Sequence, residues 1–212
     1  GLQVFGTVTK TAVATGADLV GYSGWSTSNY LEQPHNADLD FGTGDFSVTF
    51  WINKTGSVST DGINKSTNGT DGLIVNFSGS GALFFRVGGS TYMSGAFPVS
   101  KWAHVICLRT NGILKIYVNG VLQSGQTANT ASFNTTAPVT IGYNAVNNAL
   151  TDGSLSLLRI SATAPTAEQI KKMYNDEKFL FQENAKATLY GTSDAVTALA
   201  YDDDTELLHV GT

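Results

Sequence analysis

The distribution of apolar residues along the chain predicts a protein built from short β-strands. Apolar runs of strand length recur between turn-forming spacers, at residues 30–31, 46–52, 73–77, 82–87, 102–108, 113–118, 139–143 and 155–160. The spacers are rich in Gly, Asn, Asp and Ser, which form tight turns rather than the long crossovers that parallel strands need. The pattern therefore favours an all-β sandwich of mainly antiparallel strands.

The clearest hairpin in the sequence lies between Trp102 and Gly120. Asn111-Gly112 joins two alternating runs, and Asn119-Gly120 closes the second run. Asn-Gly favours the positive backbone angles of a two-residue turn, and the flanking runs are rich in Val, Ile, Leu and Tyr. Turn chemistry and strand propensity thus predict the same antiparallel pair.

One short helix is predicted directly after Pro165. Thr166 and Gln169 have the spacing of a capping box, in which each side chain bonds the backbone of the other residue. Apolar residues follow at helical spacing, at positions 170, 173 and 174. We expect this helix to cover an open end of the sandwich, with 179–181 lying against the core.

Composition and charge exclude several classes of partner. Charged residues are 14% of the chain, against roughly 25% in an average domain. The net charge is -5, and no cluster of basic residues is larger than Lys171-Lys172, which argues against a nucleic-acid partner. No apolar run approaches the roughly 20 residues that cross a bilayer, so we expect a soluble protein without membrane insertion.

The sequence contains no recognisable catalytic motif of the hydrolases considered for this type of fold. Retaining glycosidases need two carboxyl groups about 5 Å apart, often from alternate positions of one strand, and the five scattered glutamates provide no Glu-x-Asp-x-Glu string. No serine lies in a Gly-x-Ser-x-Gly elbow, and His104 is interpreted as a strand histidine of the W-x-H-V string whose hydrogen bonds are satisfied. Cys107 is the only cysteine, so no intrachain disulfide exists, and we expect a buried apolar thiol.

Sugar binding requires only a few exposed aromatic faces and some amides or carboxylates. The turn-rich stretches supply both, and the candidate ligand-binding residues are Trp25, Tyr92, Tyr143, Asn144, Asn147 and Asp152. The alternative for Trp25 and Tyr143 is that they are core residues at strand ends.

A calcium site is a second hypothesis, with candidate ligands Asp61, Asn68 and Asp71. Calcium takes six to eight oxygen ligands from carboxylates, amides and backbone carbonyls. The stretch 61–72 lacks the ligand order of an EF-hand loop, and loops of Gly, Asn and Asp are normally turns. Both interpretations remain open at this point.

Four segments together resemble laminin-G-like, concanavalin A-like jelly-roll domains. They are 29–53, with its DFGTGDFSVTFW opening, 101–120, with its W-x-H-V and Y-V-N-G strings, 138–144 and 153–175. The resemblance implies a two-sheet antiparallel jelly roll of about a dozen strands at residues 21–181, preceded by an extended segment at 1–20. That fold hosts lectins, calcium-dependent adhesion modules and glycoside hydrolases, so function has to be argued from sites.

The remaining residues, 182–212, are predicted to form an appended β-hairpin. The run 189–212 alternates on both sides of the turn Asp202-Asp203-Asp204 and resembles the opening hairpin of a β-propeller blade. A two-stranded unit is marginal in water. We therefore expect it to pack on the sandwich, to pair with 2–13, or to associate with other copies.

A laminin-G-like domain followed by such a segment also resembles modules of bacteriophage tail and virion proteins. The resemblance implies a non-catalytic, lectin-like module that contacts host surface glycans or neighbouring virion subunits. It also implies a homo-oligomer located on the virion, or otherwise outside the cell. The alternatives are a structural or assembly domain without glycan binding and, less favoured, a glycoside hydrolase.

Overall fold

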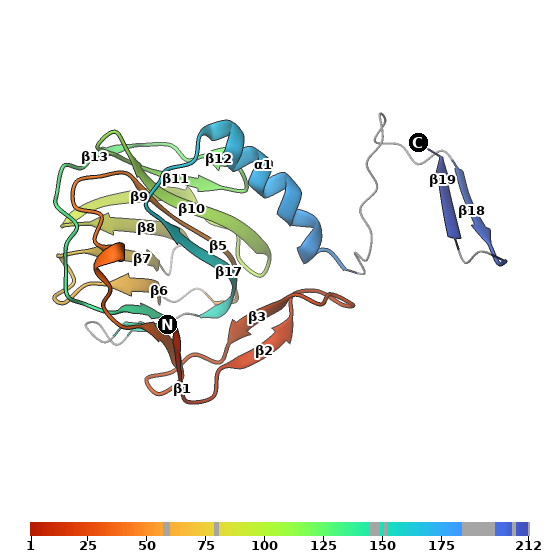
Figure 1. Cartoon of the computed structure of the whole chain (residues 1–212), viewed down its shortest axis with the longest axis horizontal. Coiled ribbons are helices and arrows are strands. Elements are labelled where there is room, and N and C mark those ends of the chain that lie inside the picture. The colour runs from red at the N-terminus through yellow and green to blue at the C-terminus, as the bar shows by residue number, and fades with distance from the viewer. Residues whose placement is uncertain are drawn as a thin grey trace.

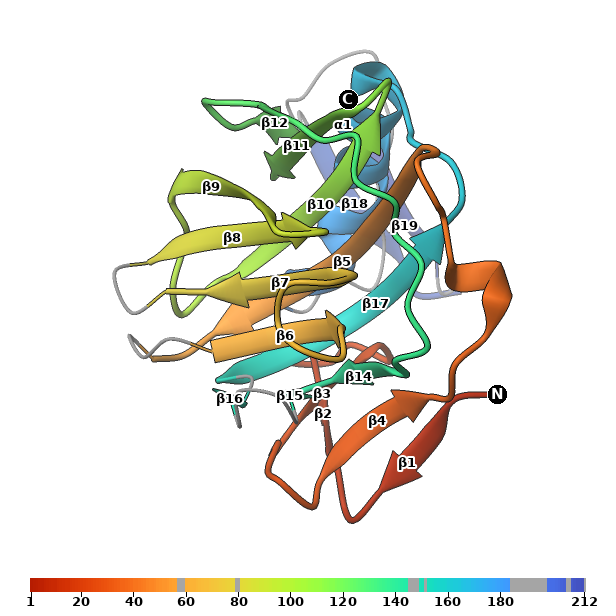
Figure 2. The same ribbon diagram turned by 90° about the vertical axis from the view of Figure 1, so that its left-hand side faces the viewer.

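The computed structural model of the chain describes residues 1–56, 60–78, 81–144, 149–150, 152–183, 198–204 and 207–211. Two antiparallel sheets pack face to face, with β6 to β9 of one sheet lying across β5 and β10 of the other (Figure 2). This arrangement confirms the predicted antiparallel sandwich.

The first sheet has seven strands in the order β1-β4-β14-β6-β7-β8-β9. Their bounds are β1 Gln3–Phe5, β4 Tyr30–Gln33, β14 Val139–Ile141, β6 Thr60–Lys65, β7 Leu73–Phe77, β8 Ala82–Val87 and β9 Ser90–Ala96.

The second sheet has eight strands in the order β12-β11-β10-β5-β17-β3-β2, with β13 also paired to β11 (Figure 1). Their bounds are β12 Val121–Leu122, β11 Ile113–Val118, β10 Trp102–Thr110, β5 Phe46–Lys54, β17 Gly153–Ser161, β3 Val20–Ser23, β2 Thr9–Ala12 and β13 Thr127–Ala128. The hairpin predicted around Asn111-Gly112 is the β10–β11 pair, in which Thr110 lies opposite Ile113.

Alternation along the strands separates the core from the outer faces. In the β5–β10 pair, Phe50 lies opposite Val105 and Val48 opposite Cys107, and all four side chains are buried in the core between the sheets. Cys107 is buried as expected, and burial raises the pKa of its thiol. Trp51 belongs to the intervening register and faces outward with its partner His104.

The N-terminal segment is built into the sandwich rather than lying outside it. The β1 strand pairs with β4 in the first sheet, and β2 pairs with β3 in the second. The expected boundary between residues 20 and 21 therefore falls inside β3. The strands β1 and β2 are the edge strands of their sheets on the same side of the molecule.

The helix predicted after Pro165 is α1, Ala167–Glu177, and the reciprocal bonds of its capping box are present. It packs on the outer face of the second sheet, where Ile170 contacts Ile106, Leu108 and Tyr117. It does not cover an open end of the sandwich, because β10 and β11 turn these apolar side chains outward and that face needs a cover. No helix in the described residues is long and apolar enough to span a membrane.

Short elements complete the chain. They are the 3-10 helices η1 Ala37–Leu39 and η2 Lys178–Phe181, and the strand pairs β15 Tyr143–Asn144 with β16 Ala149–Leu150 and β18 Ala198–Asp202 with β19 Leu207–Gly211. The β18–β19 pair is the predicted C-terminal hairpin, and it forms a two-stranded sheet of its own (Figure 1).

Candidate carbohydrate-binding site

Three aromatic rings and one carboxylate form a continuous surface on the outer face of the first sheet, here called the aromatic surface: Phe5, Tyr30, Glu32 and Tyr143. The rings of Phe5 and Tyr30 stack with centroids 4.6 Å apart and an interplanar angle of 3°. The ring of Tyr143 lies 5.2 Å from that of Tyr30, tilted by 47°. All four side chains are half-buried, so each stays accessible to a ligand.

Strand register creates this surface. Phe5 of β1 lies directly opposite Tyr30 of β4, and Gln3 lies opposite Glu32. Because side chains alternate along a strand, Tyr30 and Glu32 share the outer face while Leu31 between them enters the core. Tyr30 is the first residue of β4 and Tyr143 is the first residue of β15, and their rings are in contact.

The electrostatics keep the Tyr30 hydroxyl protonated. Burial raises the pKa of Tyr30, and the nearby charge of Glu32 raises it further. At neutral pH the surface therefore offers a hydroxyl donor beside a carboxylate acceptor, and the aromatic faces lie next to both. This combination suits a pyranose, which has one apolar face and several hydroxyl groups.

A small polar pocket of about 400 Å³ opens between β3 and the start of β17. It is lined by Ser23, Gly24, Trp25, Thr55, Asp152, Gly153 and Ser154. The Asp152 carboxylate accepts a hydrogen bond from the Thr55 hydroxyl at 2.8 Å. Two of the predicted sugar-binding residues, Trp25 and Asp152, thus come together in one pocket.

Trp25 is mainly a core residue. Only 8% of it is exposed, and its indole Nε1 donates to the carbonyl of Gly153 at 3.2 Å. Gly142 packs directly on the ring, since a Cβ there would lie 2.1 Å from Cε3. The indole is therefore a wall of the pocket rather than an exposed stacking platform.

The other predicted sugar-binding residues are placed differently. Asn144 is fully buried, and its amide donates to the carboxylate of Asp61, itself buried. The backbone of Tyr92 pairs with Phe85 in the β8–β9 ladder, but its side chain lies outside the described part of the chain. Asn147 lies outside the described residues altogether. Among the predicted residues whose side chains the structure describes, only Tyr143 lies on the aromatic surface.

The three candidate calcium ligands do not lie together. Asp61 is near the start of β6, whereas Asn68 and Asp71 are in the loop that follows the end of that strand. The Asn68 amide oxygen accepts from the backbone of Thr70 and Asp71, which closes the loop. The described residues contain no group of three or more His, Cys, Asp or Glu side chains able to hold a metal ion.

The Asp71 carboxylate already accepts hydrogen bonds from its own loop and from one distant segment. It accepts from the Ser66 hydroxyl at 2.5 Å and from the Thr67 amide at 2.8 Å, and the Thr135 hydroxyl reaches it from a distant segment at 3.2 Å. Burial alone would raise the pKa of Asp71, but the hydrogen bonds from Ser66, from the hydroxyl and amide of Thr67 and from the Asn68 amide hold it well below its usual value. The carboxylate is ionised, and calcium binding here would have to compete with these bonds.

His104 lies on the outer face of the second sheet beneath α1 and η2. Glu177, the last residue of α1, interacts with three side chains of that face. Glu177 accepts from the Trp51 indole at 2.7 Å, pairs with Arg159 at 2.6 Å and lies 3.9 Å from the imidazole of His104. Phe181 stacks on Trp51 with ring centroids 4.1 Å apart. His104 is thus a buried residue of the helix-covered face, as expected. Neither of its imidazole nitrogens has a hydrogen-bond partner among the described residues, so the expectation of a satisfied histidine is wrong.

Sequence reasoning missed Phe5, Tyr30 and Glu32 as members of the site. The signal was present in the alternation of residues 30–33, which puts Tyr30 and Glu32 on one face of a strand. The partner residue Phe5 could not be found in this way, because its position depends on which strand β1 joins.

Comparison with known proteins assigns the fold and the family. A model of the concanavalin A-like lectin/glucanases superfamily (Laminin_G_3) matches residues 25–171. The chain belongs to this superfamily. The match starts at Trp25 and ends inside α1, so it covers the strands of both sheets except β1, β2 and β3. No curated protein matches the chain in sequence.

Solved structures with the same fold include binding domains of clostridial toxins. The binding domain of Paraclostridial Mosquitocidal Protein 1 has a TM-score of 0.68 and 15% identity over 84% of this chain and 48% of its own. The binding domain of botulinum neurotoxin DC in complex with SialylT has a TM-score of 0.62 and 18% identity over 83% of this chain and 46% of its own.

A third structure, of botulinum neurotoxin type C, has a TM-score of 0.61 and 17% identity over 83% of this chain and 46% of its own; that toxin's cell entry depends on two ganglioside molecules. The chain spans about half the length of each of these toxin domains. At such identities the likeness shows the lectin-like fold alone.

Proposed function

We propose that the chain is a non-catalytic carbohydrate-binding module of a phage virion or tail protein, which contacts host surface glycans through the aromatic surface. The observation that carries the proposal is the cluster of the stacked Phe5 and Tyr30 rings with the tilted Tyr143 ring, beside Glu32. Stacked aromatic faces bind the apolar side of a sugar, and the carboxylate accepts its hydroxyl groups.

Two further findings support glycan binding. The superfamily includes lectins, and two of the similar toxin structures concern a sialylated ligand or gangliosides. The Asp152 pocket provides a second polar concavity on the same protein. The superfamily also includes glucanases, but the sequence has no strand with alternating carboxylates, so the non-catalytic function is favoured over hydrolysis.

The virion setting and the extracellular location are supported by the sequence resemblance described above, together with a low content of charged residues. Host glycans and neighbouring subunits of a homo-oligomeric virion protein are the proposed partners. Calcium stays a proposal for the loop containing Asn68 and Asp71, and it is tested together with the glycan.

The test is a glycan array probed with the whole chain, with added calcium and with EDTA, followed by titration of any hit. Replacing Tyr143 by Ala should weaken binding about tenfold, whereas Tyr143→Phe should retain it because the ring face remains. Val121→Ala is the control, since Val121 is 64% exposed and lies on β12, at the edge of the second sheet and outside both the aromatic surface and the C-terminal hairpin. A blank array from folded protein, or equal binding by Tyr143→Ala, would contradict the proposal.

One observation favours a second function, in assembly. In the β18–β19 hairpin, Leu199 lies opposite Val210 and Tyr201 opposite Leu208, so one face of the hairpin is apolar. Leu199, Tyr201 and Leu208 are each about 60% exposed. If this face joins subunits, sedimentation velocity should detect an oligomer of the full chain that is lost when residues 184–212 are removed.

A further inference from the structure

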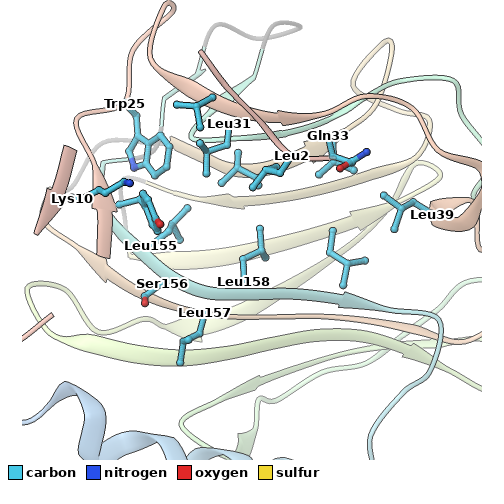
Figure 3. A pocket seen from close by; sticks show the side chains of 15 residues that line it. Leu2, Lys10, Trp25, Leu31, Gln33, Leu39, Leu155, Ser156, Leu157 and Leu158 are labelled. Atoms are coloured by element: carbon cyan, nitrogen blue, oxygen red, sulfur yellow. The ribbon is translucent and has the colours of Figure 1, made fainter. Parts of the chain in front are cut away.

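An apolar groove opens along the side of the sandwich where both sheets end. It has a volume of about 420 Å³, within the range of pockets that bind small molecules. One wall comes from β1, β4 and β14, and the other from β2, β3 and β17. Figure 3 shows Trp25 and Lys10 near one end and Leu39 at the other, so the groove is elongated. We call it the seam groove.

An irregularity in β17 keeps the seam open. The strand pairs with β3 only at Leu155, and its register with β5 shifts between Ser156 and Arg159. Leu157 adopts a positive φ of 50°, a conformation that is costly for a leucine. Leu157 is the extra residue of this bulge, and Figure 3 shows its side chain on the opposite side of β17 from Leu158. The bulge resets the alternation, so that Leu155, Leu158 and Ile160 all line the groove.

The groove reaches the main core, but its rim is uncovered. Leu31 and Leu155 on its walls are buried core residues. Leu2 and Val4 on the rim are 56% and 65% exposed. In β1, Val4 lies opposite Leu31, and so it faces the groove while Phe5 faces the aromatic surface.

We propose that the seam groove binds the hydrocarbon chain of a fatty acid, with the carboxylate of that fatty acid at Lys10. The proposal goes beyond carbohydrate binding and does not depend on it. The groove and the aromatic surface lie on opposite faces of β1 and β4, so one ligand leaves the other site free.

The chemistry of the lining selects a hydrocarbon over a polypeptide. Nearly all the lining side chains are aliphatic or aromatic, and Gln33 and Ser156 are the polar uncharged exceptions. A strand or loop of a partner protein would bury backbone N–H and C=O groups that each need a hydrogen bond. An alkyl chain has no such groups along its length, and it would cover the exposed Leu2 and Val4.

The positive charge of Lys10 favours a ligand with an anionic head group. Lys10 is the one ionic side chain of the lining, and its Nζ lies 5.8 Å from the centre of the Tyr22 ring. Within the described part of the chain, no carboxylate lies within 4 Å of this ammonium group. An anionic head group at the Lys10 end would complete an ion pair while the alkyl chain extends toward Leu39.

The test is isothermal titration of the whole chain with octanoate, decanoate and dodecanoate, each below its micelle concentration. We expect saturable one-to-one binding that tightens about fifteenfold for each added pair of methylene groups until the groove is filled. Val4→Asp should weaken dodecanoate binding at least tenfold, because it places a negative charge in the groove. Val4 is exposed on an edge strand, so this variant is expected to fold.

A second variant tests the head group. Lys10→Gln should weaken binding of dodecanoate but not of dodecanol, and Lys171→Gln on the exposed face of α1 is the matched control. Absence of saturable binding at every chain length, or equal affinity in Val4→Asp, would overturn the proposal. So would a dimer of the unliganded protein that Val4→Asp dissociates, since a second copy would then fill the groove. Tyr143→Ala should leave fatty-acid binding unchanged, which separates this result from a failure of glycan binding.

Discussion

At the scale of single residues, Gly142 is the position that lets the Trp25 indole pack against the backbone. Its φ is +83°, and a Cβ would lie 2.1 Å from the Trp25 ring. Glycine is therefore required twice, by the backbone conformation and by the close approach of the indole. The indole in turn forms a wall of both the Asp152 pocket and the seam groove.

We predict that Gly142→Ala lowers the free energy of unfolding by about 3 kcal/mol, since the methyl group adds a steric clash to a strained φ. Gly95→Ala is the control, because no atom lies within 4 Å of its added Cβ, and it should change stability by less than about 0.5 kcal/mol. Urea unfolding followed by tryptophan fluorescence measures both. Equal stabilities of the two variants would show that Trp25 moves aside at no cost.

At the scale of elements, His104 under α1 and η2 is expected to make the stability of the fold depend on pH. Burial lowers the pKa of His104 to about 4, Glu177 raises it in part, and Arg159 lowers it further. The side chain is only 1% exposed beneath the helix. The folded state therefore holds the imidazole neutral, whereas the unfolded chain protonates it near its ordinary pKa of about 6.5.

Because the unfolded state binds more protons between these two values, stability is fully present above pH 6.5 and is lost as the pH falls toward 4. The expected loss is about 3 kcal/mol. We predict that His104→Phe, which keeps a ring beside Trp51, removes this loss. The measurement is the unfolding free energy of both proteins across that range. Their difference cancels most other titrations, and a constant difference would refute the assignment.

At the scale of the whole molecule, the two ends of the chain differ in how they join the sandwich. The strands β1 and β2 extend one sheet each. Within the described residues, β18 and β19 pair with each other and with no strand of either main sheet. The C-terminal hairpin is therefore an appendage, and the N-terminal strands are part of the fold.

We predict that removing residues 184–212 changes the unfolding free energy of the sandwich by less than about 1 kcal/mol. Removing residues 1–12 should destabilise it by several kcal/mol, because it uncovers the edges of both sheets and deletes a wall of the seam groove. Chemical denaturation of the two truncated chains distinguishes them. Strong destabilisation by the C-terminal truncation would mean that the hairpin supports the sandwich.

The sequence by itself determined the local structure of this protein. Alternation predicts the strands, Asn111-Gly112 predicts the β10–β11 turn, and Thr166 with Gln169 predicts the start of α1, because each depends only on neighbouring residues. It also placed Cys107 and His104 in buried strand positions, since both lie in an apolar run.

The tertiary structure decided what depends on strand partners and bulges. It brings Phe5 against Tyr30 and turns Leu158 into the seam groove. It also buries Arg109, whose guanidinium donates hydrogen bonds to Gly42, Gly44, Asn129 and Ala131. It also placed Asn144 in the interior and α1 on the outer face of the sheet. Periodicity shows which residues share a face of a strand, but the neighbour of that strand is set by packing over the whole chain.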